Sequence, residues 1–159
     1  MIEIYPSADT LPENLLRFHI LFSQPMKAVD NLQHLQLLDQ NGKPVDGAIF
    51  NNVHELWDRD QRQLTLILDP ARVKTGLQAH ERLGRALTIG ETFQLVLQTA
   101  EDIHGNRIAQ PFVKTFHVGP PDLEAPDISR WRINAPHAHT QTPLRLDLPA
   151  PADRMSLIH

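Results

Sequence analysis

Apolar and polar residues alternate with a period of two through most of the first 119 positions. That period is typical of β-strands with one face buried. In the segment LLRFHILF, apolar residues at 16, 18, 20 and 22 alternate with Arg17 and His19. We therefore expect the apolar side chains to face a core and the two basic ones to face solvent. The segments that predict strands in this way are 15–22, 32–39, 44–50, 63–70, 91–99 and 112–118.

Turn signals separate these segments. Asn41-Gly42 predicts a hairpin between 32–39 and 44–50, because both residues tolerate positive φ. Residues 70–77 suit one helical turn, with Pro70 at its start and Gly76 at its end. No strand–helix–strand alternation follows, so a parallel α/β sheet is not expected. The pattern predicts an all-β fold, an antiparallel β-sandwich of about seven strands.

The apolar faces of these strands also predict the core. We expect the buried side chains to be Phe18, Ile20, Phe22, Leu35, Leu37, Leu64, Leu66, Leu68, Phe93, Leu95, Leu97 and Phe116.

A Pro-rich stretch, GPPDLEAPD, marks a change of organisation at residues 119–127. The sandwich domain is expected over 1–119 and a linker over 120–127. Beyond it, TPLRLDLPAPA (142–152) repeats the pattern of LRFHILFSQPM (16–26), an alternating strand that ends near a proline. Residues 128–159 are therefore interpreted as the incomplete start of a second, similar domain. Its unpaired strand edges predict that this C-terminal segment either pairs with the sheet of the first domain or forms a dimer with another chain.

Composition narrows the function classes. The 159 residues carry a net charge of -4, which offers no basic stripe for nucleic acid. There is no apolar run long enough to span a membrane, and the acidic start of the chain, with two prolines in its first 14 residues, does not predict a signal peptide. Cysteine is absent, which excludes disulfides, thiolate catalysis and cysteine-ligated metals.

Catalytic motifs are not found. None of the serines lies in a G-x-S-x-G elbow, and there is no glycine-rich phosphate loop. HELWD (54–58) lacks the second histidine of a zinc-protease helix, since Asp58 stands in its place. We interpret it as a strand and turn with Trp57 at the sandwich edge, and the chain is expected not to be an enzyme.

Histidines are the remaining candidates for chemistry. His104 lies in EDIHGN, which favours a turn capped by Asp102, with positive φ at Gly105 or Asn106. The other interpretation makes His104 a surface copper or zinc ligand. His137 and His139 would point to the same side of an extended chain and could offer two nitrogens to a metal.

Several motifs in order carry a family resemblance. FSQPM, LLDQNGKPVDG, QLTLILDP, FQLVLQTAEDIHGNRI and KTFHVG follow one another between residues 22 and 119. As a set they resemble bacterial Ig-like domains of S-layer and other surface proteins, over about residues 5–119. The resemblance implies an Ig-like sandwich that serves as a structural or interaction module. It also implies a larger, exported parent protein, whose other domains or protein partners the module contacts.

A second resemblance concerns the same turn. Periplasmic copper-resistance proteins of the C type are small Ig-like sandwiches with an Asp-Gly-His near this late turn, whose histidine is a copper ligand. Here the order is Asp102-Ile103-His104-Gly105-Asn106, and its Gly-Asn end matches the plain Ig-like turn. The leading hypothesis is thus a module without a cofactor. The alternative is a periplasmic copper carrier with ligands among His104, His137 and His139.

Overall fold

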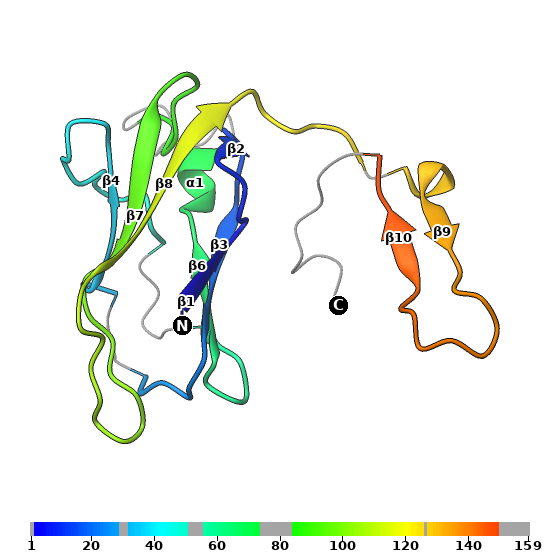
Figure 1. Cartoon of the computed structure of the whole chain (residues 1–159). Helices are drawn as coiled ribbons and strands as arrows, with labels where there is room; N and C mark the ends of the chain where they lie inside the picture. The colour runs from blue at the N-terminus through cyan, green and yellow to red at the C-terminus, as the bar shows by residue number, and fades with distance from the viewer. Residues whose placement is uncertain (1, 29–31, 51–55, 74–83, 126, 150–159) are drawn as a thin grey trace. The chain divides into compact units, whose positions relative to one another are not determined.

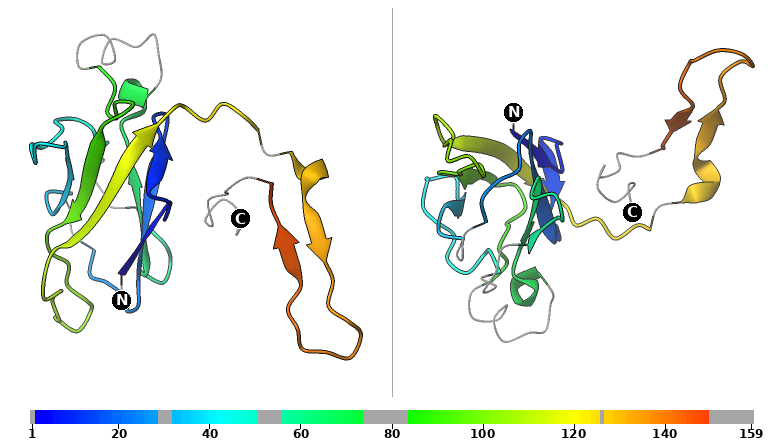
Figure 2. Two further views of the ribbon diagram at one scale, coloured as in Figure 1. Left: turned by 45° about the horizontal axis from the view of Figure 1, so that its top comes forward. Right: turned by 90° about the horizontal axis from the view of Figure 1, so that it is seen from below.

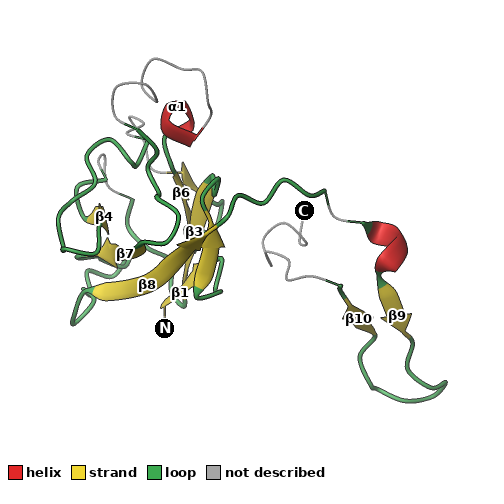
Figure 3. Cartoon of the chain, turned by 90° about the horizontal axis from the view of Figure 1, so that it is seen from above, coloured by secondary structure: helices red, strands yellow, loops and turns green. Residues whose placement is uncertain are grey.

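The computed structural model describes residues 2–28, 32–50, 56–73, 84–125 and 127–149 (Figure 1). The chain divides into two compact units, Met1–Asp122 and Leu123–His159. The predicted all-β sandwich is confirmed in the first unit, where two four-stranded sheets face each other (Figure 2). Helix is confined, within the described residues, to one turn of α-helix and one 3-10 turn (Figure 3).

One sheet has the order β1-β3-β6-β5, with every neighbouring pair antiparallel. Its strands are β1 (Ile2–Tyr5), β3 (Arg17–Phe22), β6 (Gln63–Ile67) and β5 (Leu56–Trp57). The other has the order β2-β8-β7-β4. Its strands are β2 (Thr10–Pro12), β8 (Phe112–Gly119), β7 (Thr92–Leu97) and β4 (Leu35–Leu38).

The core lies between the sheets and consists of the side chains that the alternation predicted. All twelve predicted core residues are buried. Phe116 on β8 packs against Phe18 of the opposite sheet, with ring centroids 5.5 Å apart, and against Phe93 of its own sheet at 6.1 Å. These aromatic contacts join the two layers near the centre of the core.

The prediction of purely antiparallel sheets is wrong at the N-terminus. The alternation assigned no strand before residue 15. In the structure β1 pairs antiparallel with β3, whereas β2 pairs in parallel with β8. The first twelve residues thus contribute an edge strand to each sheet. Both strands are only three or four residues long, too short for alternation to reveal them.

The predicted return strand at 44–50 is also wrong. Gly42 has the expected positive φ of 76°, but only Pro44 bridges to Leu38 of β4, while Ile49 bridges to Leu68 after β6. The turn expected at Asn41-Gly42 does form, because Asp39 N–H donates to the Lys43 carbonyl and Val45 N–H to the Leu37 carbonyl, both at 2.9 Å. Beyond this turn the chain crosses to the other sheet instead of continuing as a return strand. Ala48 is fully buried at the crossing.

The solvent exposure of His19 and Leu16 also differs from what the alternation predicts. His19 was expected in solvent but is only 5% exposed, and its Nδ1 lies 3.1 Å from the Thr65 hydroxyl. It is covered because β3 is an interior strand, flanked by β1 and β6. Leu16 shares the apolar face of the alternation, outside the predicted core list, but it precedes β3 and is 45% exposed. Of the HELWD segment, residues 54 and 55 lie outside the described residues, and Trp57 lies on the edge strand β5, as expected.

The predicted helical turn at 70–77 begins as α1 (Pro70–Val73), while its expected end at Gly76 lies outside the described residues. This turn carries a buried arginine. Arg72 donates from Nε to the Gly84 carbonyl at 3.1 Å and from Nη2 to the Arg85 carbonyl at 3.0 Å. It also donates from Nη1 to the Asp46 carbonyl. Burial lowers the pKa of Arg72, while Asp69 and Asp46 act in the opposite direction. One side chain thereby ties α1 to two separate loop segments, around Asp46 and at residues 84–85.

The second unit contains the 3-10 turn η1 (Ile128–Arg130) and a two-stranded hairpin of β9 (Arg132–Asn134) and β10 (Arg145–Asp147). That residues 128–159 begin a second Ig-like domain stays a prediction. None of the described helices is long and apolar enough to span a membrane.

Candidate functional site

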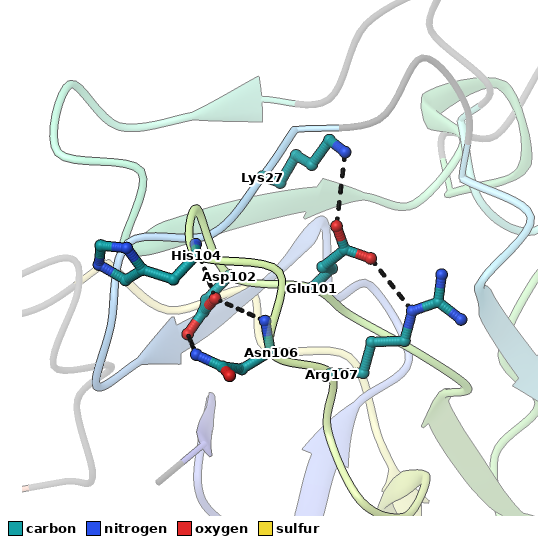
Figure 4. A network of polar contacts seen from close by, with 6 residues as sticks. All are labelled: Lys27, Glu101, Asp102, His104, Asn106 and Arg107. Carbon is teal, nitrogen blue, oxygen red and sulfur yellow. Dashed lines mark hydrogen bonds and ion pairs between the residues drawn. The ribbon is translucent and has the colours of Figure 1, made fainter.

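The segment 101–107 between β7 and β8 forms a tight turn organised by Asp102 (Figure 4). The Asp102 carboxylate accepts hydrogen bonds from the backbone N–H of His104 at 2.8 Å and of Asn106 at 2.9 Å. The Asn106 side-chain amide donates to it as well, at 2.9 Å. Gly105 has a φ of 86°, so the capping and the positive φ expected from EDIHGN are both present.

These hydrogen bonds have an electrostatic consequence. The pKa of Asp102 is lowered, above all by the hydrogen bond from the Asn106 side chain and then by that from the Asn106 backbone. The residue is largely buried, at 9% exposure, and Met26 forms a bridge with it across the sandwich end. Asp102 is thus committed to holding the turn, and its oxygens are occupied.

The His104 side chain is exposed and points away from the Asp102 carboxylate (Figure 4). Only its backbone N–H takes part in the turn. The copper-ligand interpretation of His104 stays untested by this geometry, because an exposed imidazole remains accessible to a metal.

Beside the turn, Glu101 joins two cations. Its carboxylate contacts Lys27 Nζ at 3.4 Å and Arg107 Nε at 3.0 Å (Figure 4). The pKa of Glu101 is lowered, mainly by the hydrogen bond from Arg107 and then by that from Lys27. The sequence analysis missed this cluster, since Lys27 is 74 residues away from Glu101.

His137 and His139 lie in the second unit, in the connection between β9 and β10. The extended arrangement expected for them is not found. His139 has a φ of 64°, and the His137 carbonyl accepts hydrogen bonds from the Thr140 backbone at 3.3 Å and its hydroxyl at 2.8 Å. The two histidines thus belong to a turn, where same-side projection no longer follows from strand geometry. Within the described ranges, no group of three or more His, Asp or Glu residues could hold a metal ion.

The hairpin has two chemically different faces. On one, Asp147 accepts from Asn134 Nδ2 and Arg145 Nε, both at 2.8 Å, and the pKa of Asp147 is lowered mainly by Arg145. On the other, Ile133 lies directly opposite Leu146. Strand alternation places further apolar residues on this side. We call this set the apolar hairpin face: Trp131, Ile133, Leu144, Leu146 and Leu148.

Comparison with known proteins adds a fold likeness. No protein-family model matches the chain, and no curated protein sequence does. The crystal structure of CopC from Methylosinus trichosporium OB3b is similar, at 16% sequence identity and a TM-score of 0.48. The match covers 77% of this chain and 95% of CopC. At this identity and score it does not indicate what the present chain binds.

Proposed function

We propose that this protein is a non-catalytic interaction module. The β-sandwich is the rigid scaffold, and the C-terminal hairpin is the element that contacts a partner. The resemblance of its ordered motifs to surface-protein Ig-like domains supports a place in a larger, exported bacterial protein, outside the cytoplasm.

The apolar hairpin face is the observation that supports this proposal most strongly. Ile133 is 68% exposed, Leu144 61% and Leu146 39%. A two-stranded hairpin is marginally stable by itself in water, and a third layer or strand normally covers its apolar side. An apolar face backed by an ordered polar face therefore marks a contact surface.

We propose that a second copy of the chain covers this face, and we compare the net charges of the hairpin and of the sandwich. Segment 128–148 contains three arginines and one aspartate, a net charge of +2 with neutral histidines. Residues 1–122 contain 11 Lys and Arg against 15 Asp and Glu, a net charge of -4. The hairpin segment and the sandwich thus carry opposite net charges, although residues 123–159 as a whole carry four basic and four acidic side chains. We propose a dimer in which the hairpin of one molecule contacts the sandwich of another.

Sedimentation equilibrium tests the proposal. The full chain should dimerise with rising concentration, whereas Leu146→Arg should remain monomeric because it places a charge in the apolar hairpin face. Gln141→Arg is the matched control, since Gln141 is exposed in the β9–β10 connection and adds the same charge elsewhere. A full chain that stays monomeric at high concentration, or a Leu146→Arg variant that dimerises like wild type, contradicts the proposed dimer.

The copper-carrier alternative requires ligands that converge. His104 lies in the first unit and the other two candidates in the second, and each side chain is exposed. No geometric observation favours a copper site, so the alternative rests on the sequence resemblance and is tested by the metal titration described below.

A further inference from the structure

A cavity of about 510 Å³ opens at one end of the sandwich, beside the 101–107 turn. Its walls come from both sheets at the positions where their strands begin or end. Phe22 is the last residue of β3, Trp57 is the last of β5, and Leu97 is the last of β7. Its size is within the range of small-molecule sites in proteins, which span about 300–1,000 Å³.

The floor of this cavity is apolar and aromatic. The Phe22 and Trp57 rings lie 5.5 Å apart and are tilted by 39° to each other. Leu64 and Leu97 continue the floor and are almost completely buried. Phe22 and Trp57 form a surface against which a flat apolar body can pack.

The mouth of the cavity carries the charged cluster of Lys27, Glu101 and Arg107. Two cations share one carboxylate, so the cluster has a net charge of +1. Both carboxylate oxygens of Glu101 are occupied, one by each cation. The side chains of Lys27 and Arg107 are 63% and 75% exposed and retain donors for a further acceptor.

We propose that this cavity binds a small amphipathic anion, an aromatic carboxylate whose ring lies on the Phe22–Trp57 floor and whose carboxylate is held by Lys27 and Arg107. A cationic ligand is disfavoured because Glu101 is already neutralised. A neutral ligand leaves the two cations at the mouth without a new partner. The site lies in the first unit alone and does not depend on the hairpin or on the proposed dimer.

Three probes that share one ring test the charge requirement: 2-naphthoate, 2-naphthamide and 2-naphthylmethylammonium. Binding is measured by isothermal titration and by the fluorescence of Trp57. The fluorescence uses a Trp131→Phe background, because the chain has two tryptophans. We expect 2-naphthoate to bind at least about tenfold more tightly than the amide, and the ammonium to bind least. Salt should weaken naphthoate binding, because the cations are exposed.

Two variants test whether Lys27 and Arg107 hold the carboxylate of the ligand. Lys27→Gln and Arg107→Gln should each weaken 2-naphthoate by about tenfold, the loss expected for one charge-assisted hydrogen bond, and leave the amide unchanged. Lys43→Gln is the matched control, an exposed lysine in the turn after β4 that does not border the cavity. Thermal melts verify that each variant is folded.

Three results would overturn the proposal. The first is no naphthoate binding at about 1 mM, a concentration that detects even weak sites. The second is equal affinity for carboxylate and amide. The third is naphthoate binding that Lys27→Gln and Arg107→Gln leave intact.

Discussion

Gly105 holds the 101–107 turn in a backbone conformation that side chains disfavour. Its φ is 86°, and a Cβ built there would meet no atom within 4 Å. The cost of Gly105→Val is therefore backbone strain, about 1–2 kcal/mol of unfolding free energy or more. His104→Ala should change that free energy by less than about 0.5 kcal/mol, because the side chain is exposed. Urea titrations that rank the two variants equally would contradict this account of the turn.

Asp102 should make the stability of the turn depend on acidity. The pKa of Asp102 is lower in the folded state than in the unfolded chain. As the pH falls, the unfolded chain therefore takes up a proton at this carboxylate before the folded protein does. The stabilisation is complete at neutral pH and is lost as the pH falls from about 4 through the folded pKa. The stability difference between wild type and Asp102→Asn should then shrink on acidification. A difference that stays constant between neutral pH and pH about 2 would show that the carboxylate is not the stabilising group.

His104 provides the test of the copper alternative. Thermal melts of wild type and His104→Ala, each with and without Cu(II), separate the two interpretations. If the protein is an interaction module without a metal site, neither wild type nor His104→Ala should gain stability from Cu(II). A copper ligand would instead give wild type a stabilisation of about 2.7 kcal/mol at a hundredfold excess over the dissociation constant. Loss of that gain in His104→Ala would promote the copper carrier over the module.

At the scale of the elements, Arg72 connects α1 to the loops around Asp46 and Gly84. A lysine at this position has one charged nitrogen and cannot serve three carbonyls with the geometry of a guanidinium. Arg72→Lys should lower the free energy of unfolding by roughly 1.5–3 kcal/mol. The control is Arg62→Lys, since Arg62 is exposed in the turn before β6 and should tolerate the change. Equal denaturant midpoints for the two variants would count against this role of Arg72.

The strands that the sequence predicts well are those with sustained alternation. β3, β6, β7 and β8 carry their core side chains on one face, so period two marks both the strand and those side chains. Short edge strands such as β1 and β2 give too few positions for a period. Burial of His19 also escapes prediction, because it depends on neighbours supplied by β1 and β6. The outer face of an interior strand is not necessarily solvent.

In the candidate site too, the sequence predicts local features but not contacts between distant segments. The Asp102 cap and the Gly105 conformation are local, and the motif EDIHGN predicts them. The Lys27–Glu101–Arg107 cluster and the cavity depend on segments brought together by the sandwich topology. Lys27 reaches Glu101 because residues 26 and 27 pair with 101 and 102 across the end of the sandwich. No single-sequence spacing encodes that contact.

At the scale of the whole molecule, the proposed function places the scaffold and the contact surface in different parts of the chain. The sandwich buries a continuous core and holds its turns through Asp102 and Arg72. The hairpin has no comparable core among its described residues, and Ile133, Leu144 and Leu146 remain exposed. Stability and interaction are thus separable, and a variant in the hairpin should alter association without unfolding the sandwich.

Hydrogen exchange of the β9 and β10 amides, followed as a function of protein concentration, tests this claim most directly. An isolated two-stranded hairpin opens readily, so its amides exchange fast in a monomer. If a second copy covers the apolar hairpin face, the Ile133 and Leu146 amides should become protected as concentration rises. That protection should be absent in Leu146→Arg, while β3 and β7 remain equally protected in both proteins. Hairpin exchange that is fast at every concentration, or protected equally in the variant, would contradict the account.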